Sequence, residues 1–118
     1  MANIMIVDDD SVTVKLLQTL LELEGFDVIP IRRGADVVPA VLQQNPDAIL
    51  MDYHLQDMDG VEIVRDLRGR DEYASLPIIV TSGLNVETEA MEAGASLFLV
   101  KPFEPDELPR LFNQFIEG

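Results

Sequence analysis

The stretch AILMDYHLQDMDG, residues 48 to 60, begins as an apolar run and goes on to three aspartates and a glycine. The segment IMIVDDD, residues 4 to 10, has the same order near the N-terminus. Short runs composed almost entirely of Ile, Leu, Met and Val are typical of strands that are covered on both faces, as in a parallel sheet. Because the carboxyl ends of parallel strands meet at one edge of the sheet, we expect Asp8, Asp9 and Asp10 of the second stretch to lie there together with Asp52 of the first.

Apolar runs of strand length alternate along the chain with segments that have a helical spacing of apolar residues. The predicted strands are Asn3 to Val7, Phe26 to Ile31, Ala48 to Met51, Pro77 to Thr81 and Leu97 to Val100. The predicted helices are Ser11 to Leu23, Ala35 to Gln44, Val61 to Leu67, Glu87 to Ala93 and Asp106 to Ile116. Five strand-helix pairs in succession predict a doubly wound α/β fold with a five-stranded parallel sheet in the order 2-1-3-4-5. A chain of 118 residues is expected to form a single domain, residues 1-118.

Two prolines constrain where the predicted helices begin. Pro39 and Pro109 each lie about one turn inside a predicted helix, where proline removes a hydrogen bond and costs about 3 kcal/mol. These two helices must therefore begin later or bend. At the first predicted helix, Asp10 or Ser11 is the expected N-cap.

The composition excludes several classes of protein. A net charge of -14 opposes binding to phosphate backbones or anionic lipid, so we expect no direct contact with nucleic acid or membrane. The chain has no cysteine, which excludes disulfides, a thiolate zinc site and a cysteine nucleophile. No apolar run approaches the roughly 20 residues of a membrane span and the N-terminus lacks a basic signal-peptide start, so we expect a cytoplasmic location. Met1 is placed as a natural start would be, whereas Gly118 fits the end of a stand-alone domain and of an excised one equally well.

The carboxyl ends of four predicted strands carry residues suited to chemistry. They are Asp8 and Asp9 after the first strand, Asp52 after the third, Thr81 at the end of the fourth and Lys101 after the fifth. If the first and third strands are neighbours, about 4.8 Å apart, Asp9 and Asp52 share one small space. Two carboxylates at about 4 Å repel by roughly 4 kcal/mol at an effective dielectric near 20, so either one is protonated or a cation lies between them. Oxygen ligands without cysteine favour Mg²⁺ over zinc.

Mg²⁺ held by carboxylates indicates phosphoryl chemistry, because the ion usually completes its coordination with water and phosphate oxygens. Lys101 offers a positive charge to a phosphoryl oxygen, and Thr81 offers a hydroxyl donor. An aspartate carboxylate can act as nucleophile and form an acyl phosphate. Since positioning and charge neutralisation supply most of the catalysis of phosphoryl transfer, these few groups are sufficient.

With these residues in place, the sequence resembles the receiver domain of two-component response regulators over essentially its whole length. The resemblance depends on four motifs, in this order and at compatible spacings: IMIVDDD, ILMDYHLQDMDG, IIVTS and GASLFLVKPF. It implies a flavodoxin-like (βα)5 fold and a role in phosphorelay signal transduction, with Asp52 as the phosphoacceptor. The donor would be a phosphohistidine on a sensor histidine kinase or a histidine phosphotransfer protein.

The resemblance also implies a metal site. Mg²⁺, or Mn²⁺ as a substitute, would be bound directly by Asp9 and Asp52, through a water molecule by Asp8, and by the main-chain carbonyl of His54. Such a domain is not a conventional enzyme, since it assists its own phosphorylation and dephosphorylation.

The remaining implied roles concern the response to phosphorylation. Thr81 and Lys101 would contact the phosphoryl oxygens, and Phe98 matches an aromatic residue that turns inward when Thr81 moves toward the phosphoryl group. This movement would remodel the surface of helix four, strand five and helix five for a downstream protein or effector domain. Phosphorylation adds a charge of roughly -1.5 to -2, so the state that brings Thr81 and Lys101 closest is favoured. A monomer or a weak phosphorylation-dependent dimer is expected.

Several features depart from the usual pattern of the family. Gln56 stands where proline is usual, which predicts a less rigid loop after the acceptor aspartate. His54 and Gly83 occupy positions that influence how long the phosphoryl group survives. Phe98 replaces the commoner tyrosine, and the segment between the fourth and fifth strands is about two residues short, which predicts a truncated fourth helix.

Two other functions are compatible with the same residues. DDDSV, residues 8 to 12, satisfies the D-x-D-x-[TV] pattern of haloacid-dehalogenase phosphatases, in which Asp8 would be the nucleophile and Asp10 an acid/base. The other alternative is a receiver-like binding module that is not phosphorylated.

The motif DMDG, residues 57 to 60, resembles part of a calcium-binding loop. Leu55 stands where that loop needs an oxygen ligand, so the calcium interpretation fails. Asp57 or Asp59 is instead expected to cap the helix that follows.

Overall fold

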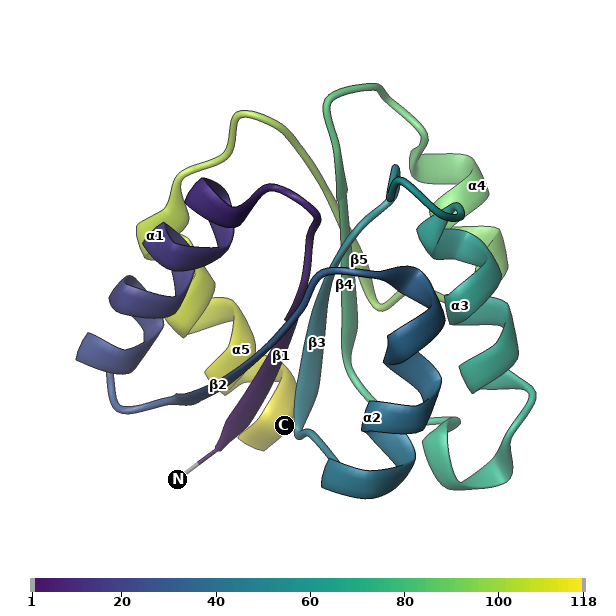
Figure 1. Cartoon of the computed structure of the whole chain (residues 1–118), viewed down its shortest axis with the longest axis horizontal. Coiled ribbons are helices and arrows are strands. Elements are labelled where there is room, and N and C mark those ends of the chain that lie inside the picture. The colour runs from purple at the N-terminus through teal and green to yellow at the C-terminus, as the bar shows by residue number, and fades with distance from the viewer. Residues whose placement is uncertain (1, 118) are drawn as a thin grey trace.

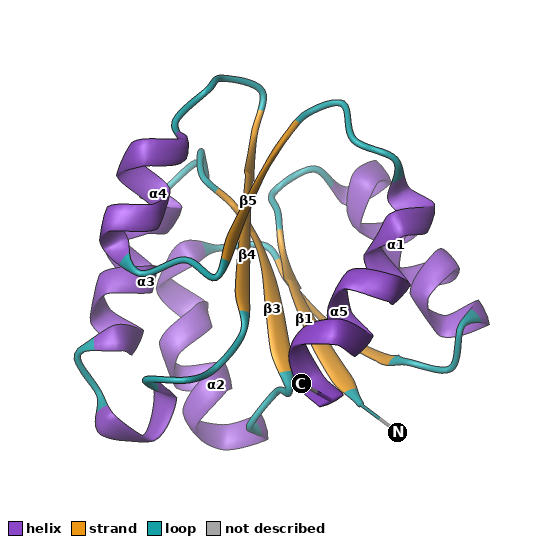
Figure 2. Ribbon diagram, turned by 180° about the vertical axis from the view of Figure 1, so that it is seen from behind, coloured by secondary structure: helices purple, strands orange, loops and turns teal. Residues whose placement is uncertain are grey.

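In the computed structural model, which describes residues 2–117, a central parallel sheet lies between two layers of helices (Figure 1). The strand order is β2-β1-β3-β4-β5, which confirms the predicted doubly wound topology. The strands are β1 (Asn3–Val7), β2 (Asp27–Ile31), β3 (Ala48–Asp52), β4 (Ile78–Ser82) and β5 (Leu97–Val100). The α-helices are α1 (Ser11–Leu23), α2 (Val37–Gln44), α3 (Gly60–Arg68), α4 (Glu87–Ala93) and α5 (Leu108–Glu117). Helices α1 and α5 cover one face, and α2, α3 and α4 cover the other (Figure 2).

Three short 3₁₀ turns complete the described chain: η1 (Gly34–Asp36), η2 (Asp71–Tyr73) and η3 (Pro105–Glu107). Among residues 2–117, none of the helices combines the length and apolar character that a membrane crossing requires.

Apolar side chains fill both faces of the sheet. Along β1, Ile4 and Ile6 pack on the α1 and α5 side, whereas Met5 and Val7 pack on the α2 to α4 side. All four side chains are buried because successive residues of a strand point to opposite faces and each face is covered by helices. The continuous apolar runs of the sequence follow from this double burial.

The two prolines are accommodated by helices that begin later than the sequence predicted. Helix α2 begins at Val37 rather than Ala35, and α5 begins at Leu108 rather than Asp106, since a 3₁₀ turn precedes each helix. Pro39 and Pro109 therefore lie in the first turn. The backbone N–H groups there have no partner within the helix, so proline removes no hydrogen bond.

Helix α4 is the shortest of the five described α-helices, with seven residues, which agrees with the short segment between the fourth and fifth predicted strands. Its C-terminal end is held by Arg68 of α3. The guanidinium donates from Nε to the Gly94 carbonyl at 2.8 Å, and from its terminal nitrogens to the Tyr73 carbonyl at 2.7 Å and Ser96 Oγ at 3.3 Å. Gly94 has φ +114°, and a Cβ added to it would lie 2.6 Å from Arg68 Cγ, so this junction requires glycine.

Candidate functional site

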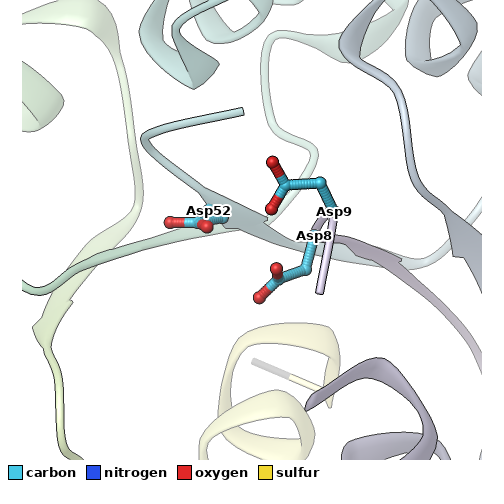
Figure 3. A group of neighbouring side chains, drawn as sticks. All are labelled: Asp8, Asp9 and Asp52. Carbon is cyan, nitrogen blue, oxygen red and sulfur yellow. The ribbon is translucent and has the colours of Figure 1, made fainter. Parts of the chain in front are cut away.

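Three carboxylates converge at the carboxyl edge of the sheet. Asp8 and Asp9 follow β1 and Asp52 ends β3; each residue contributes a carboxylate oxygen, and these oxygens all lie within 4.8 Å of one another (Figure 3). The neighbourhood results from the parallel pairing of β1 with β3, in which Val7 lies opposite Met51. Asp8 is buried. The structure thus brings together Asp9 and Asp52, which the sequence predicted to share one space, and places Asp8 with them.

Lys101 is the positive charge of this site. Its Nζ lies 3.6 Å from a carboxylate oxygen of Asp8 and 3.6 Å from one of Asp52. The lysine is placed by its own backbone, because its N–H donates to the Ser82 carbonyl at 2.7 Å where β4 and β5 end. One ammonium group therefore lies beside two of the three carboxylates, and the cluster keeps an excess of negative charge.

This excess charge affects the ionisation of Asp52. Burial of its carboxyl group raises its pKa above the ordinary value, the nearby charges of Asp8 and Asp9 raise it further, and Lys101 opposes them. The side chain of Asp52 is 12% exposed, so solvent relieves the repulsion only in part.

The donor set fits a small divalent cation. Asp8, Asp9 and Asp52 offer hard oxygen atoms, which suit Mg²⁺, and no soft ligand lies among them. The exposed side chain of His54 packs beside the ring of Tyr53, with ring centroids 4.6 Å apart. The backbone N–H of His54 lies 3.5 Å from an Asp52 carboxylate oxygen, so the main chain at this residue borders the cluster.

Thr81 and Phe98 occupy neighbouring strands beside the acidic cluster. Thr81 is buried and lies opposite Asp52 in the register of β3 and β4. Phe98 is half-buried; it packs against the apolar layer on the α2 to α4 side and lines a surface hollow with Asn85 and Val100. The ring thus lies between the core and the outer surface of β5.

A cavity of about 240 Å³ adjoins the site, between α1 and the connection from β5 to α5. Asp52, Thr81 and Lys101 line one part of it. Apolar side chains line the rest, including Leu16, to which the sequence assigned no role, and Phe103, the last residue of the motif GASLFLVKPF. Leu16 is next to the buried residue Leu17 on α1, and its own side chain is 60% exposed.

The third aspartate of the DDD run does not face the acidic cluster. Asp10 is the N-cap of α1: its carboxylate accepts the Val12 N–H at 3.1 Å and the Thr13 hydroxyl at 2.8 Å. These bonds lower the pKa of Asp10, the Thr13 hydroxyl contributing most. The phosphatase alternative needs Asp10 as acid/base, so this engagement argues against it.

The two aspartates of the DMDG motif have different environments. Asp59 is the N-cap residue of α3, and its backbone N–H donates to the Glu62 carboxylate at 3.3 Å, as in a capping box. Asp57 instead accepts hydrogen bonds from the distant backbone amides of Gly34 and Ala35. The predicted cap is therefore Asp59, and Asp57 has a role that the sequence did not reveal.

The fold and the site together define a class of protein: a doubly wound α/β domain with an acidic cluster, a threonine and a lysine at the carboxyl edge of its sheet. The chain belongs to the response regulator receiver domain family, whose model matches residues 4–113. It is therefore a receiver domain, and its role lies in two-component signal transduction.

Individual relatives support this assignment. The transcriptional regulatory protein GltR of Pseudomonas aeruginosa is 36% identical over 109 residues, which cover 90% of this chain and 45% of GltR. Protein PilH of the same species is 31% identical over 121 residues and is covered completely, as is this chain. The chain thus spans about half the length of a relative such as GltR and the whole length of PilH.

Among solved structures, the receiver domain of a sensor histidine kinase from Pseudomonas aeruginosa aligns with a TM-score of 0.89 and 30% identity, over 99% of this chain and 98% of that one. That structure has a magnesium ion coordinated in its active site cleft. Mg²⁺ binding by a close structural relative agrees with the donor chemistry of the cluster described above.

Proposed function

We propose that this domain accepts a phosphoryl group on Asp52 from a phosphohistidine of a sensor histidine kinase or a histidine phosphotransfer protein. The observation that carries the proposal is the position of the Asp52 carboxylate, which lies among two further carboxylates and 3.6 Å from an ammonium group. The fold keeps the Asp52 carboxylate close to two other carboxylates although they repel one another. The nearby Lys101 ammonium can stabilise the negative charge of phosphoryl oxygens.

In the transfer step, an Asp52 carboxylate oxygen forms a bond to phosphorus as the bond from phosphorus to the imidazole nitrogen breaks, and the imidazole keeps that electron pair. Asp9 and Asp52 would hold Mg²⁺ directly, Asp8 would hold it through water, and the His54 carbonyl would complete the protein ligands. When bound there, Mg²⁺ supplies positive charge to the phosphoryl oxygens, and Mn²⁺ can replace it. Lys101 donates to a second phosphoryl oxygen, for which its flexible stem and proximity to Asp52 suit it.

The switch uses Thr81 and Phe98. The Thr81 hydroxyl donates to the phosphoryl group, and the half-buried ring of Phe98 moves inward as Thr81 shifts. Helix α4, strand β5 and helix α5 then present an altered surface to a downstream protein or effector domain. Leu84, Met91 and Val100 are large apolar side chains exposed near this surface, with exposed fractions of 62%, 43% and 50%. Because the ring of Phe98 has no hydroxyl group, its inward movement does not require a hydrogen-bond partner.

The phosphohistidine donor docks on α1. Val12, Leu16 and Leu23 have exposed fractions of 75%, 60% and 82%, and their spacing places them on one side of the helix. Leu16 also lines the cavity that reaches Asp52, so this apolar stripe is continuous with the site. A donor that covers the stripe brings its phosphohistidine to the open side of the acceptor carboxylate.

The wider setting follows from these roles. Residues 1-118 form a single receiver domain that works in the cytoplasm as a monomer or a weak phosphorylation-dependent dimer. It is a phosphoacceptor rather than a conventional enzyme, and it binds neither nucleic acid nor membrane directly, since its net charge of -14 opposes both.

The test is the intact mass of the protein after incubation with a small acyl phosphate and Mg²⁺, with an established receiver domain treated in parallel. One added phosphoryl group that is absent from Asp52→Asn and from the Mg²⁺-free sample is the expected result. No adduct on the wild-type chain would instead support a binding module. An acyl phosphate located on Asp8 by peptide mapping would support the phosphatase alternative.

A further inference from the structure

The loop between Asp52 and α3 is closed on itself at its base. The Gly60 N–H donates to the Tyr53 carbonyl at 2.6 Å, and the Leu55 N–H donates to the Met58 carbonyl at 3.2 Å. The same loop contains His54, whose backbone borders the acidic cluster. The bond from Leu55 to Met58 links the tip of this loop, residues 55–58, to the residue that follows His54, so a displaced tip shifts the backbone that borders the cluster.

Asp57 fastens this tip to a different part of the chain. One carboxylate oxygen accepts the Gly34 N–H and the other accepts the Ala35 N–H, each at 2.9 Å. These amides belong to η1, at the carboxyl end of β2, and are 23 and 22 residues away in the sequence. Hydrogen bonds from backbone amides to a carboxylate are charge-assisted and directional, and two of them fix both oxygens of the side chain.

The ionisation of Asp57 agrees with this geometry. The Ala35 and Gly34 amides lower the pKa of the Asp57 carboxyl group, with a smaller contribution from the charge of Arg33. The group is thus a carboxylate throughout the neutral range, and the two bonds are present under the conditions in which the domain works.

Gly34 fits closely against the tip of the loop. A Cβ added to this buried residue would lie 2.5 Å from Met58 Cγ, 2.7 Å from Met58 Sδ and 3.2 Å from Asp57 Oδ1. The absence of a side chain therefore lets Met58 and the Asp57 carboxylate approach η1. Gly34 thus fits closely against Met58 and Asp57. An aspartate that only contacted solvent would not require such a fit.

We propose that Asp57 is a positioning residue for the magnesium site, which it serves by fixing the loop that carries His54. The inference rests on the proposed function, in which the His54 carbonyl is a metal ligand. Proline would restrict the backbone of this loop, but Gln56 leaves it free, so the constraint comes from the neighbouring carboxylate and its two amide donors. Loss of this constraint weakens Mg²⁺ binding and leaves the chemistry of the loaded site unchanged.

The test compares Mg²⁺ binding by calorimetric titration in the wild type, Asp57→Ala and Asp57→Asn. We expect the dissociation constant to rise about 3- to 10-fold in Asp57→Ala, at or below the range found when residues that orient metal ligands are removed. Asn keeps one acceptor oxygen, so Asp57→Asn should have a smaller effect. Phosphorylation by a small acyl phosphate should slow at low Mg²⁺ and recover its wild-type rate at saturating Mg²⁺.

Two further variants separate this role from general stability and from charge. Asp47→Ala is the matched control, because Asp47 accepts the Asn3 N–H at 2.7 Å near the opposite end of the sheet, and it should leave Mg²⁺ affinity unchanged. Gly34→Ala keeps every charge but crowds Met58 and the Asp57 carboxylate, so it should weaken Mg²⁺ binding in the same direction as Asp57→Ala but less, because the flexible Met58 side chain can move aside. Hydrogen exchange at the Gly34 and Ala35 amides should accelerate in Asp57→Ala and not in Asp47→Ala.

Each outcome is decisive. Mg²⁺ affinity that falls equally in Asp57→Ala and Asp47→Ala would reduce Asp57 to a stabilising contact and overturn the inference. Mg²⁺ affinity that falls equally in Asp57→Ala and Asp57→Asn, with no faster exchange at the Gly34 and Ala35 amides, would attribute the effect to charge alone, which also overturns it. A wild-type protein that binds no Mg²⁺ would overturn both the inference and the proposed metal site, whereas normal binding in all variants would overturn the inference alone.

Discussion

Replacing Asp52 with asparagine should stabilise the magnesium-free protein at neutral pH. The substitution removes one charge from three carboxylates whose oxygens lie within 4.8 Å, and each such pair repels by about 3.5 kcal/mol or more at an effective dielectric near 20. It also removes the attraction to the Lys101 ammonium at 3.6 Å, about 4.5 kcal/mol on the same basis. Two repulsions exceed one attraction, and solvent around the partly exposed Asp9 and Lys101 screens all three terms and so reduces the net repulsion.

We therefore expect a gain of about 1–2 kcal/mol in the free energy of unfolding, or a Tm about 4–8 °C higher for a domain of this size. The sign follows from the raised pKa of Asp52, because the folded state favours the neutral carboxyl group. The stability that this preference contributes is fully present below the unfolded pKa of 3.8 and is lost as the pH rises through the folded pKa. The advantage of Asp52→Asn should therefore shrink as the pH is lowered toward 3.8.

The assay is urea denaturation followed by circular dichroism, in a chelating buffer and then with Mg²⁺. Asp27→Asn is the control, since it removes an exposed carboxylate at the start of β2 and changes the net charge equally. Saturating Mg²⁺, at about 100 times its dissociation constant, should stabilise the wild type by about 2.7 kcal/mol and cancel the advantage of the variant. A variant no more stable than Asp27→Asn, or an advantage that persists near pH 3.8, would refute the electrostatic account.

Three other substitutions test separate parts of the structure. Arg68→Ala should lower the free energy of unfolding, measured by urea denaturation, by about 2–3 kcal/mol, because three acceptors lose a partly buried guanidinium donor. Arg65→Ala is the control and should change it little, because Arg65 is exposed. Asp10→Ala should lower the Tm at neutral pH through loss of the α1 cap. The lowered pKa of this carboxyl group means that its contribution is present above pH 3.8 and lost as the pH falls through the folded pKa, so scans at several pH values should show the two proteins converging. Leu16→Glu should leave the free energy of unfolding within about 0.5 kcal/mol of the wild-type value. It should slow phosphotransfer from a phosphohistidine donor about tenfold or more and leave the rate from a small acyl phosphate unchanged. Equal slowing with both donors would contradict docking on α1.

Local residue patterns were sufficient for the architecture and for the acidic cluster. The double burial of β1 is visible in the sequence as an apolar run, because every residue of such a strand needs an apolar environment. Asp8, Asp9, Asp52 and Lys101 follow strand ends, and parallel strands place those ends at one edge. The predicted starts of α2 and α5 were wrong by two residues. The early proline in each helix required a later start or a bend, but the sequence did not show where the preceding 3₁₀ turn ends.

The sequence by itself determined the alternation of strands and helices, the two-faced core and the charged edge, because these follow from the periodicity and polarity of neighbouring residues; the sheet order was then expected from the doubly wound class to which that alternation points. Only the tertiary structure decided the role of Asp57, the junction of Arg68 with Gly94, and the cavity between Leu16 and Phe103. Each of these joins segments more than 20 residues apart, through the orientation of individual side chains. Such contacts depend on how helices and loops settle against one another after the sheet has formed, which no local pattern encodes.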